Sequence, residues 1–86
     1  MITLYRVGQS EWYSGWCPSG IHMEIGFHHG WGRFALWTYT PPTINGKRCI
    51  ESNRVEPFGY EINSLESLVE RLENRYECTI NLLEEE

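Results

Sequence analysis

The sequence contains no aspartate and only one lysine, Lys47, so all 12 acidic side chains are glutamates and every other cation is an arginine. The formal net charge is −5. Affinity for DNA and RNA comes largely from lysine and arginine side chains that neutralise phosphates, and this chain has few of either. Direct binding of nucleic acid is therefore disfavoured.

Cysteine is also scarce. Cys17, Cys49 and Cys78 are odd in number and have no Cys-x-x-Cys spacing, which argues against a disulfide framework and a zinc knuckle. We expect free thiols buried like small hydrophobic side chains. No apolar run approaches the ~20 residues that span a bilayer, and no basic start leads into an apolar stretch with a cleavage site. These absences favour a soluble cytoplasmic protein that does not bind membranes.

The patterns that accompany catalysis are missing as well. The chain has no aspartate to orient a histidine, no Gly-x-Ser-x-Gly motif and no cysteine near a base in the sequence. Residues 26–32 are rich in glycine, but they lack the Lys-Ser/Thr of a phosphate-binding loop and precede a predicted strand rather than a helix. We therefore expect a protein that is not an enzyme and needs no cofactor.

A length of 86 residues allows one domain. We place this domain at residues 1–83 and expect the acidic tail, residues 84–86, to be frayed. Strands are predicted at residues 1–7 and 21–27, where apolar and polar residues alternate in part or throughout, and at residues 33–40 and 48–55, the last as the returning strand of a hairpin. Residues 9–20 form either a loop or a short irregular strand. The Asn45-Gly46 pair predicts a type I′ hairpin turn.

Both faces of the predicted strand 33–40 are largely apolar, which predicts a central strand covered on each side. The most regular pattern is an amphipathic helix from Ser64 to about Glu77, with Asn63 as the N-cap and Glu66 completing a capping box. Residues 78–83 read as a final strand, although Ile80 would also continue the apolar stripe of a longer helix. The fold class is α+β, an antiparallel sheet of four to five strands packed against one helix.

Four glutamates of the predicted helix form a single stripe, which we call the acidic ridge: Glu66, Glu70, Glu73 and Glu77. At 100° per residue they lie within about 60° of one another, beside the apolar face. Like charges three or four residues apart each cost about 0.2–0.5 kcal/mol, so the ridge costs roughly 1 kcal/mol. It is either a solvated face, partly neutralised by Lys47, Arg48 or Arg54, or a surface matched to a basic patch on another protein.

The tryptophans are a second candidate for binding. Four aromatic residues lie in glycine-rich segments of the first half of the chain: Trp12, Tyr13, Trp16 and Trp31. Tryptophan and tyrosine are favoured anchors of protein interfaces, so exposed rings here would bind a partner. The alternative is that these rings complete the core of a small domain.

Three residues around the predicted strand 21–27 form a third candidate. His22, Glu24 and His28 project from one face, but two steps along a strand span about 6.5–7 Å, so only converging side chains could share a metal ion. We expect solvent-facing or hydrogen-bonded histidines. The alternative function is a metal-binding or small-molecule-binding domain, with or without enzymatic activity, built from these residues and the nearby tryptophans.

Binding rather than catalysis is the function that these patterns favour. Small acidic proteins without catalytic residues are often inhibitors, such as immunity proteins, antitoxins and phage-encoded blockers of host defence whose carboxylates replace nucleic-acid phosphates. We expect the acidic ridge to steer the protein toward a partner with a basic surface, for instance a nucleic-acid-binding protein, and the aromatic residues to anchor it. The sequence does not indicate the partner's identity or the oligomeric state.

Overall fold

The computed structural model describes residues 1–84. In chain order its elements are β1 (Ile2–Arg6), β2 (Tyr13–Trp16), β3 (His22–His28), β4 (Arg33–Thr40), β5 (Thr43–Ile44), β6 (Lys47–Arg48), β7 (Ser52–Pro57), α1 (Leu65–Tyr76) and β8 (Ile80–Leu83). The predicted α+β class is confirmed. None of the described residues forms a helix that is long and apolar enough to cross a membrane.

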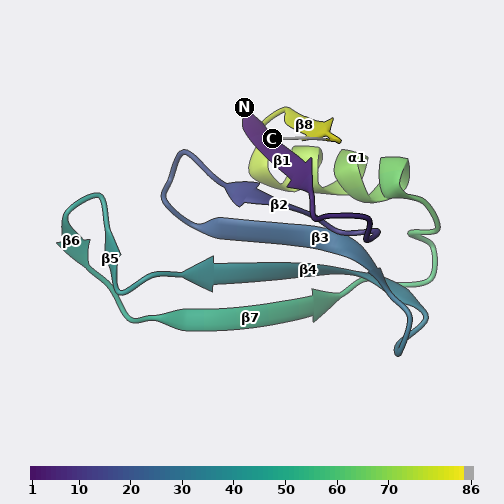
Figure 1. The fold of residues 1–86 in the computed structure, drawn as a ribbon, viewed down its shortest axis with the longest axis horizontal. Helices are drawn as coiled ribbons and strands as arrows, with labels where there is room; N and C mark the ends of the chain where they lie inside the picture. The colour runs from purple at the N-terminus through teal and green to yellow at the C-terminus, as the bar shows by residue number, and fades with distance from the viewer. Residues whose placement is uncertain (85–86) are drawn as a thin grey trace.

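Six strands form one sheet in the order β7-β4-β3-β2-β1-β8 (Figure 1). Neighbouring strands are antiparallel except at one edge, where β8 pairs in parallel with β1. The five strands of the first sixty residues form the predicted antiparallel sheet, and the final strand, β8, adds one parallel pair at its edge. A parallel pair needs a crossover connection, which α1 supplies before β8. Residues 80–83 are therefore a strand, and the alternative of one longer helix is wrong.

Both ends of α1 differ from the prediction. The N-cap is Ser64, not Asn63: Ser64 has an extended backbone, and its hydroxyl oxygen accepts a hydrogen bond from the Ser67 N–H at 3.1 Å. A side-chain oxygen in this position satisfies one of the free N–H groups of the first turn. The helix ends at Tyr76, because Glu77 adopts a left-handed conformation with φ 51°. Glu77 therefore caps the helix instead of extending it.

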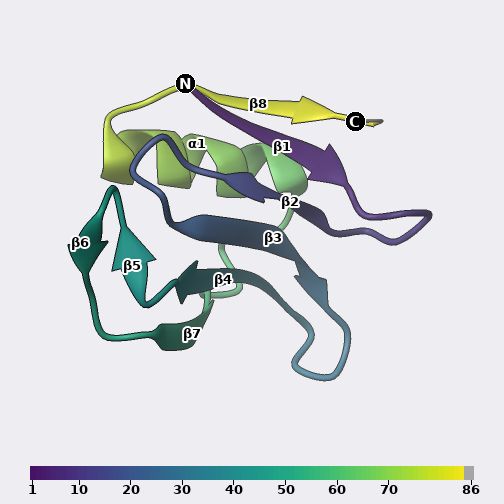
Figure 2. The ribbon, with the colours of Figure 1, turned by 60° about the vertical axis from the view of Figure 1, so that its left-hand side comes forward.

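The core lies between α1 and one face of the sheet. Leu68 and Leu72 of α1 and Leu4 and Ile25 of the sheet are all completely buried. Fully burying one such side chain contributes roughly 1.5–3 kcal/mol, so these contacts hold the helix to the sheet. Figures 1 and 2 show α1 nearest the edge of the sheet that contains β1 and β8, with β7 at the opposite edge.

The other face of the sheet has no second layer among residues 1–84 (Figure 2). The prediction that residues 33–40 are covered on each side is therefore wrong. Leu36 of β4 points to the helix and is buried, whereas Trp37 and Tyr39 point away from it and remain half-buried. The apolar character of this second face comes from aromatic rings that lie on it. We call this face, the one opposite α1, the open face.

The predicted Asn-Gly hairpin is present as a small ribbon of β5 and β6. Asn45 and Gly46 both have positive φ, 50° and 79°, as a type I′ turn requires. The returning strand, predicted at residues 48–55, instead begins at Ser52, where the chain leaves the ribbon and pairs with β4. The Cys49 N–H donates to the Pro42 carbonyl at 2.8 Å and so closes the ribbon.

Candidate functional site

The open face is rich in aromatic side chains because of the strand register. Residues that alternate along β2, β3 and β4 align across the sheet: Trp16 is opposite His22, His22 is opposite Tyr39, and Glu24 lies between Ser14 and Trp37. Trp12 precedes β2 and continues the same alternation. All four tryptophans of the chain lie on this face or at its end.

Trp12 lies flat against the sheet because of a glycine beneath it. A Cβ added to Gly26 would lie 2.6 Å from the Trp12 ring, a distance that real Cβ atoms do not show. The ring therefore occupies the space where any other residue would have a side chain. Its centroid is 5.4 Å from that of Trp37, with the planes tilted by 57°. This separation is typical of a favourable aromatic pair.

A second aromatic group lies nearer the opposite end of these strands. The Trp16 ring packs edge-on against His22, with centroids 4.9 Å apart, and lies 6.5 Å from Tyr39. Trp16 nevertheless remains 58% exposed. A tryptophan held by its neighbours and still open to solvent is a suitable anchor for a partner, because little side-chain freedom remains to be lost on binding.

The turn between β3 and β4 contributes the fourth tryptophan. The Trp31 ring stacks on His28 with centroids 4.1 Å apart and planes 18° apart, and the backbone N–H of Trp31 donates to His28 Nδ1 at 3.2 Å. His28 also approaches Trp37, with centroids 6.1 Å apart. Trp12, Trp37, His28 and Trp31 thus form one continuous row of rings.

Glu24 is the acidic residue of β3, and it lies between the two aromatic groups. It helps line a shallow hollow of about 340 Å³ together with His22, Trp37, Thr38, Tyr39 and Asn53. Within residues 1–84 no cation lies within ion-pair distance of Glu24, and its side chain takes part in none of the hydrogen bonds. A carboxylate beside aromatic rings, with no internal partner, favours a cationic group from another molecule.

The acidic ridge lies on the opposite side of the molecule and is smaller than the sequence predicts. Glu66 and Glu70 are exposed on α1. Glu73 instead turns inward, where its carboxylate accepts a hydrogen bond from the Ile80 N–H at 2.8 Å. Glu77 lies beyond the helix as its cap. Since α1 covers the other side of the sheet, one flat partner surface cannot contact both Glu70 and the open face.

Tyr13 is the predicted anchor that does not join the tryptophans. It points toward α1 and packs against the core, and its hydroxyl donates to the Glu84 carboxylate at 3.2 Å. Burial, followed by the charge of Glu84, raises the pKa of Tyr13 above its ordinary value. Glu84 also pairs with Arg6 at 3.3 Å. The rest of the predicted frayed tail, residues 85–86, lies outside the described residues.

The candidate metal ligands share a face but do not form a site. His22, Glu24 and His28 all lie on the open face of β3. Within residues 1–84 no group of three or more histidine, cysteine or acidic side chains is placed to hold a metal ion. His22 and His28 instead pack against Trp16 and Trp31.

Sequence reasoning missed Trp37 and Tyr39 as candidate binding residues. Both were assigned to a covered strand because every residue of β4 from Phe34 to Tyr39 except Thr38 is apolar or aromatic. The residue types on the two faces of β4 distinguish its buried face from its exposed face. One face of β4 carries Phe34 and Leu36, and the other carries Trp37 and Tyr39, whose polar ring atoms suit a surface in contact with water.

The chain was compared with protein-family models, with curated proteins and with solved structures, and none of them matched. Within residues 1–84, the open face offers a partner a set of planar rings and one carboxylate, that of Glu24, without an internal counterion.

Proposed function

We propose that the protein is a non-enzymatic binding module whose open face docks on a basic surface of a partner protein. Lysine or arginine side chains of the partner pair with Glu24, and their neighbours pack on Trp12, Trp16, Trp31 and Trp37. The observation that carries the proposal is the Glu24 carboxylate, which lies among aromatic rings and has no cation near it within residues 1–84. An inhibitor that covers the basic surface of its target is the form of this function that we favour.

The open face supports the proposal better than the acidic ridge does. Of the ridge glutamates, Glu73 has an internal hydrogen bond, which leaves mainly Glu66 and Glu70 for a partner. Ion pairs between exposed charges contribute about 0–1 kcal/mol each, too little for a docking site by themselves. Buried aromatic anchors, by contrast, often supply 2 kcal/mol or more at an interface. The ridge is therefore assigned long-range steering and the open face the direct contact.

The expected strength of the contact follows from its parts. A cation over a tryptophan face contributes about 0.5–1 kcal/mol when exposed and about 2 kcal/mol when desolvated. A partner cation that also reaches the Glu24 carboxylate would add a charge-assisted hydrogen bond of about 1.5–3 kcal/mol. The two contributions sum to about 2–5 kcal/mol. One basic side chain thus supplies roughly 30-fold to several thousandfold in affinity, because 1.4 kcal/mol corresponds to a factor of ten.

The test uses short peptides that are identical except for one central residue, which is arginine, lysine, glutamine or glutamate. Binding is followed by the tryptophan fluorescence of the protein. We expect the arginine and lysine peptides to bind most tightly, and Glu24→Gln to remove most of their advantage over the glutamine peptide. Glu70→Gln is the matched control, since it removes the same charge from α1 without touching the open face.

Two results obtained with the wild-type protein would contradict the proposal. One is equal binding of all four peptides, which would leave Glu24 without a role. The other is tighter binding of a single-stranded oligonucleotide than of any peptide, which would make the tryptophans a stacking surface for bases. If Glu70→Gln weakened binding more than Glu24→Gln did, the acidic ridge would be the docking site instead.

A further inference from the structure

The helix does not cover the whole inner face of the sheet. With 12 residues α1 is about 18 Å long, whereas the eight residues of β4 extend over about 26 Å. Beyond the last helical residue, Tyr76, the helix-facing side chains of Thr38, Thr40 and Ser52 have no helix above them. A groove remains at this end of the molecule, with a volume of about 610 Å³.

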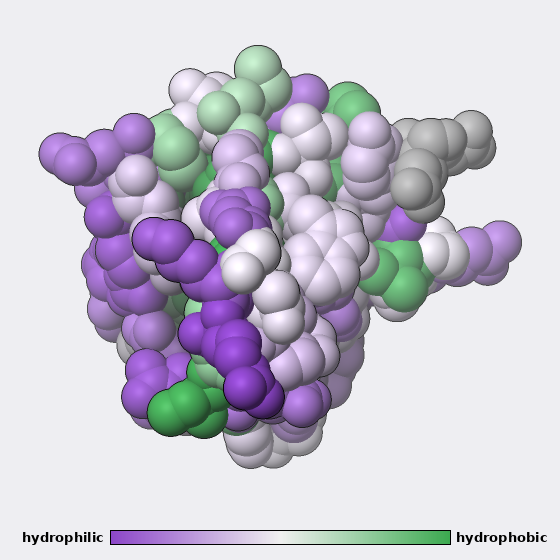
Figure 3. All heavy atoms as spheres, turned by 90° about the vertical axis from the view of Figure 1, so that its left-hand side faces the viewer, coloured by the Kyte–Doolittle hydropathy of each residue, from purple (hydrophilic) through white to green (hydrophobic). Residues whose placement is uncertain are grey.

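Apolar residues form the floor and one rim of this groove, which we call the end groove. Ile2 and Met23 lie in its floor and are almost fully buried, and Cys17 and Cys78 line it as well. Ile50 lies at the rim and is 89% exposed. Figure 3, which views this end of the molecule, shows hydrophobic residues set between hydrophilic ones rather than one continuous patch.

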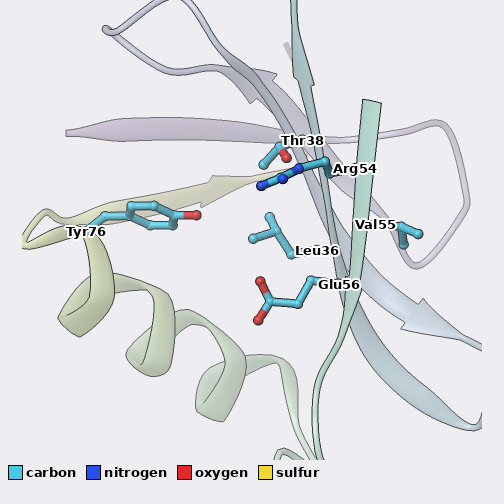
Figure 4. A pocket seen from close by; sticks show the side chains of 6 residues that line it. All are labelled: Leu36, Thr38, Arg54, Val55, Glu56 and Tyr76. Carbon is cyan, nitrogen blue, oxygen red and sulfur yellow. The ribbon is translucent and has the colours of Figure 1, made fainter. Parts of the chain in front are cut away.

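Arg54 of β7 is the one basic side chain that lines the end groove among the described residues, and Met1, which carries the N-terminal amino group, lines it as well. Its side chain extends toward the Tyr76 hydroxyl across an adjoining pocket of about 420 Å³, which shares Thr38, Arg54 and Tyr76 with the groove (Figure 4). Within residues 1–84 no carboxylate lies within 4.0 Å of the Arg54 guanidinium. A ligand with one negative charge would provide the missing counterion.

The acidic side chain that could pair with Arg54 from the same strand already has another partner. Glu56 lies two residues from Arg54 on the same side of β7 (Figure 4), but both of its oxygens accept hydrogen bonds from Arg75, at 2.9 and 2.8 Å. A carboxylate held at both oxygens by one guanidinium is a strong, directed pair. This pair keeps Glu56 away from Arg54 and leaves the arginine available.

We propose that the end groove binds a small amphipathic carboxylate, such as a medium-chain fatty acid, with its carboxylate on Arg54 and its chain along the apolar floor. The volume of the groove lies within the range of about 300–1,000 Å³ that is typical of small-molecule sites. The hydroxyls of Thr38, Thr40 and Tyr76 are suited to donate to the second carboxylate oxygen. Ile50, exposed in the free protein, would cover the chain.

The test is calorimetric titration with decanoate, and with decanol as the uncharged ligand of equal chain length, both below the concentration at which they aggregate. We expect decanoate to bind at least tenfold more tightly than decanol, and Arg54→Gln to bring the two affinities together. Arg48→Gln is the matched control, because it removes an equal charge from the neighbouring β6 ribbon outside the groove. Ile50→Ser should weaken both ligands.

Equal binding of decanoate and decanol by the wild-type protein would overturn the assignment of Arg54. Unchanged affinities of Ile50→Ser for both ligands would overturn the assignment of the groove. A wild-type protein that does not bind decanoate would overturn it as well. Arg54 and Ile50 are both exposed, so their variants should fold. The circular dichroism spectrum of each variant verifies this before the titration.

Discussion

The packing of Trp12 over Gly26 can be tested by adding one methyl group. Gly26→Ala would place a Cβ 2.6 Å from the Trp12 ring, so the ring has to lift away from the sheet. Lifting also separates it from Trp37, whose centroid is now 5.4 Å away. The substitution therefore disturbs the open face without changing any residue that would contact a partner directly.

The size of the effect follows from three contributions. Overpacking costs about 1–3 kcal/mol, and the low end applies because Trp12 is only half-buried and can move outward. Loss of the Trp12–Trp37 pair adds about 0.5–1.5 kcal/mol. Replacing glycine with alanine restricts the unfolded chain and returns about 0.4–1 kcal/mol. We expect Gly26→Ala to lower the free energy of unfolding by about 1–2 kcal/mol.

The assay is urea denaturation of four proteins: the wild type, Gly26→Ala, Trp12→Ala and the double variant. If Trp12 causes the cost, Gly26→Ala should become neutral or slightly stabilising once the ring is absent. An equal cost in both backgrounds would refute the reasoning, because Trp12 would then not lie over Gly26. Gly15→Ala is the contrasting case: its Cβ would meet the Thr3 backbone carbonyl, which cannot move aside, and should cost more than about 3 kcal/mol.

Three further predictions concern α1 and the end groove. Glu73→Ala should lower the free energy of unfolding, measured in urea, by about 1–3 kcal/mol, because it leaves the Ile80 N–H without its acceptor. Glu70→Ala should change this free energy by less than about 0.5 kcal/mol. Equal effects of the two substitutions would contradict the inward position of Glu73. Glu77→Gly should raise the thermal midpoint, since glycine adopts the left-handed cap without strain, and a lowered midpoint would argue against that conformation. Cys17 should react with iodoacetamide more slowly than free cysteine at neutral pH, because burial, with a smaller effect of Cys78, raises the pKa of its thiol and lowers the thiolate fraction. Mass spectrometry of the labelled peptide measures the reaction rate. Labelling of Cys17 as fast as free cysteine would contradict its burial.

Local patterns were enough to predict several elements. Residues 33–40 are largely apolar or aromatic and lie between a glycine turn and two prolines, and they form β4 with the predicted bounds. The apolar spacing from Leu65 to Tyr76 predicts α1, because only a helix places Leu68 and Leu72 on the same buried side. Asn45-Gly46 predicts its hairpin, since few other residue pairs accept two positive φ angles.

Contacts between distant segments were not predictable in this way. The parallel pairing of β8 with β1 joins Ile2 to Ile80, and no local pattern encodes a partner so far along the chain. Gly15 and Pro18 hid the alternation around β2, so the opposite orientations of Trp12 and Tyr13 were missed. The inward position of the Glu73 carboxylate depends on its hydrogen bond with the Ile80 N–H, which is available only because β8 follows the helix cap.

The most direct test of the proposed docking role is a two-dimensional ¹H–¹⁵N spectrum recorded while an arginine-containing peptide is added. The indole N–H signals of Trp12, Trp16 and Trp37 and the amide of Glu24 should move, while the amides of Glu66 and Glu70 on α1 stay in place. Movement of the α1 signals alone, with the indole signals unchanged, would contradict the assignment of the open face as the docking surface.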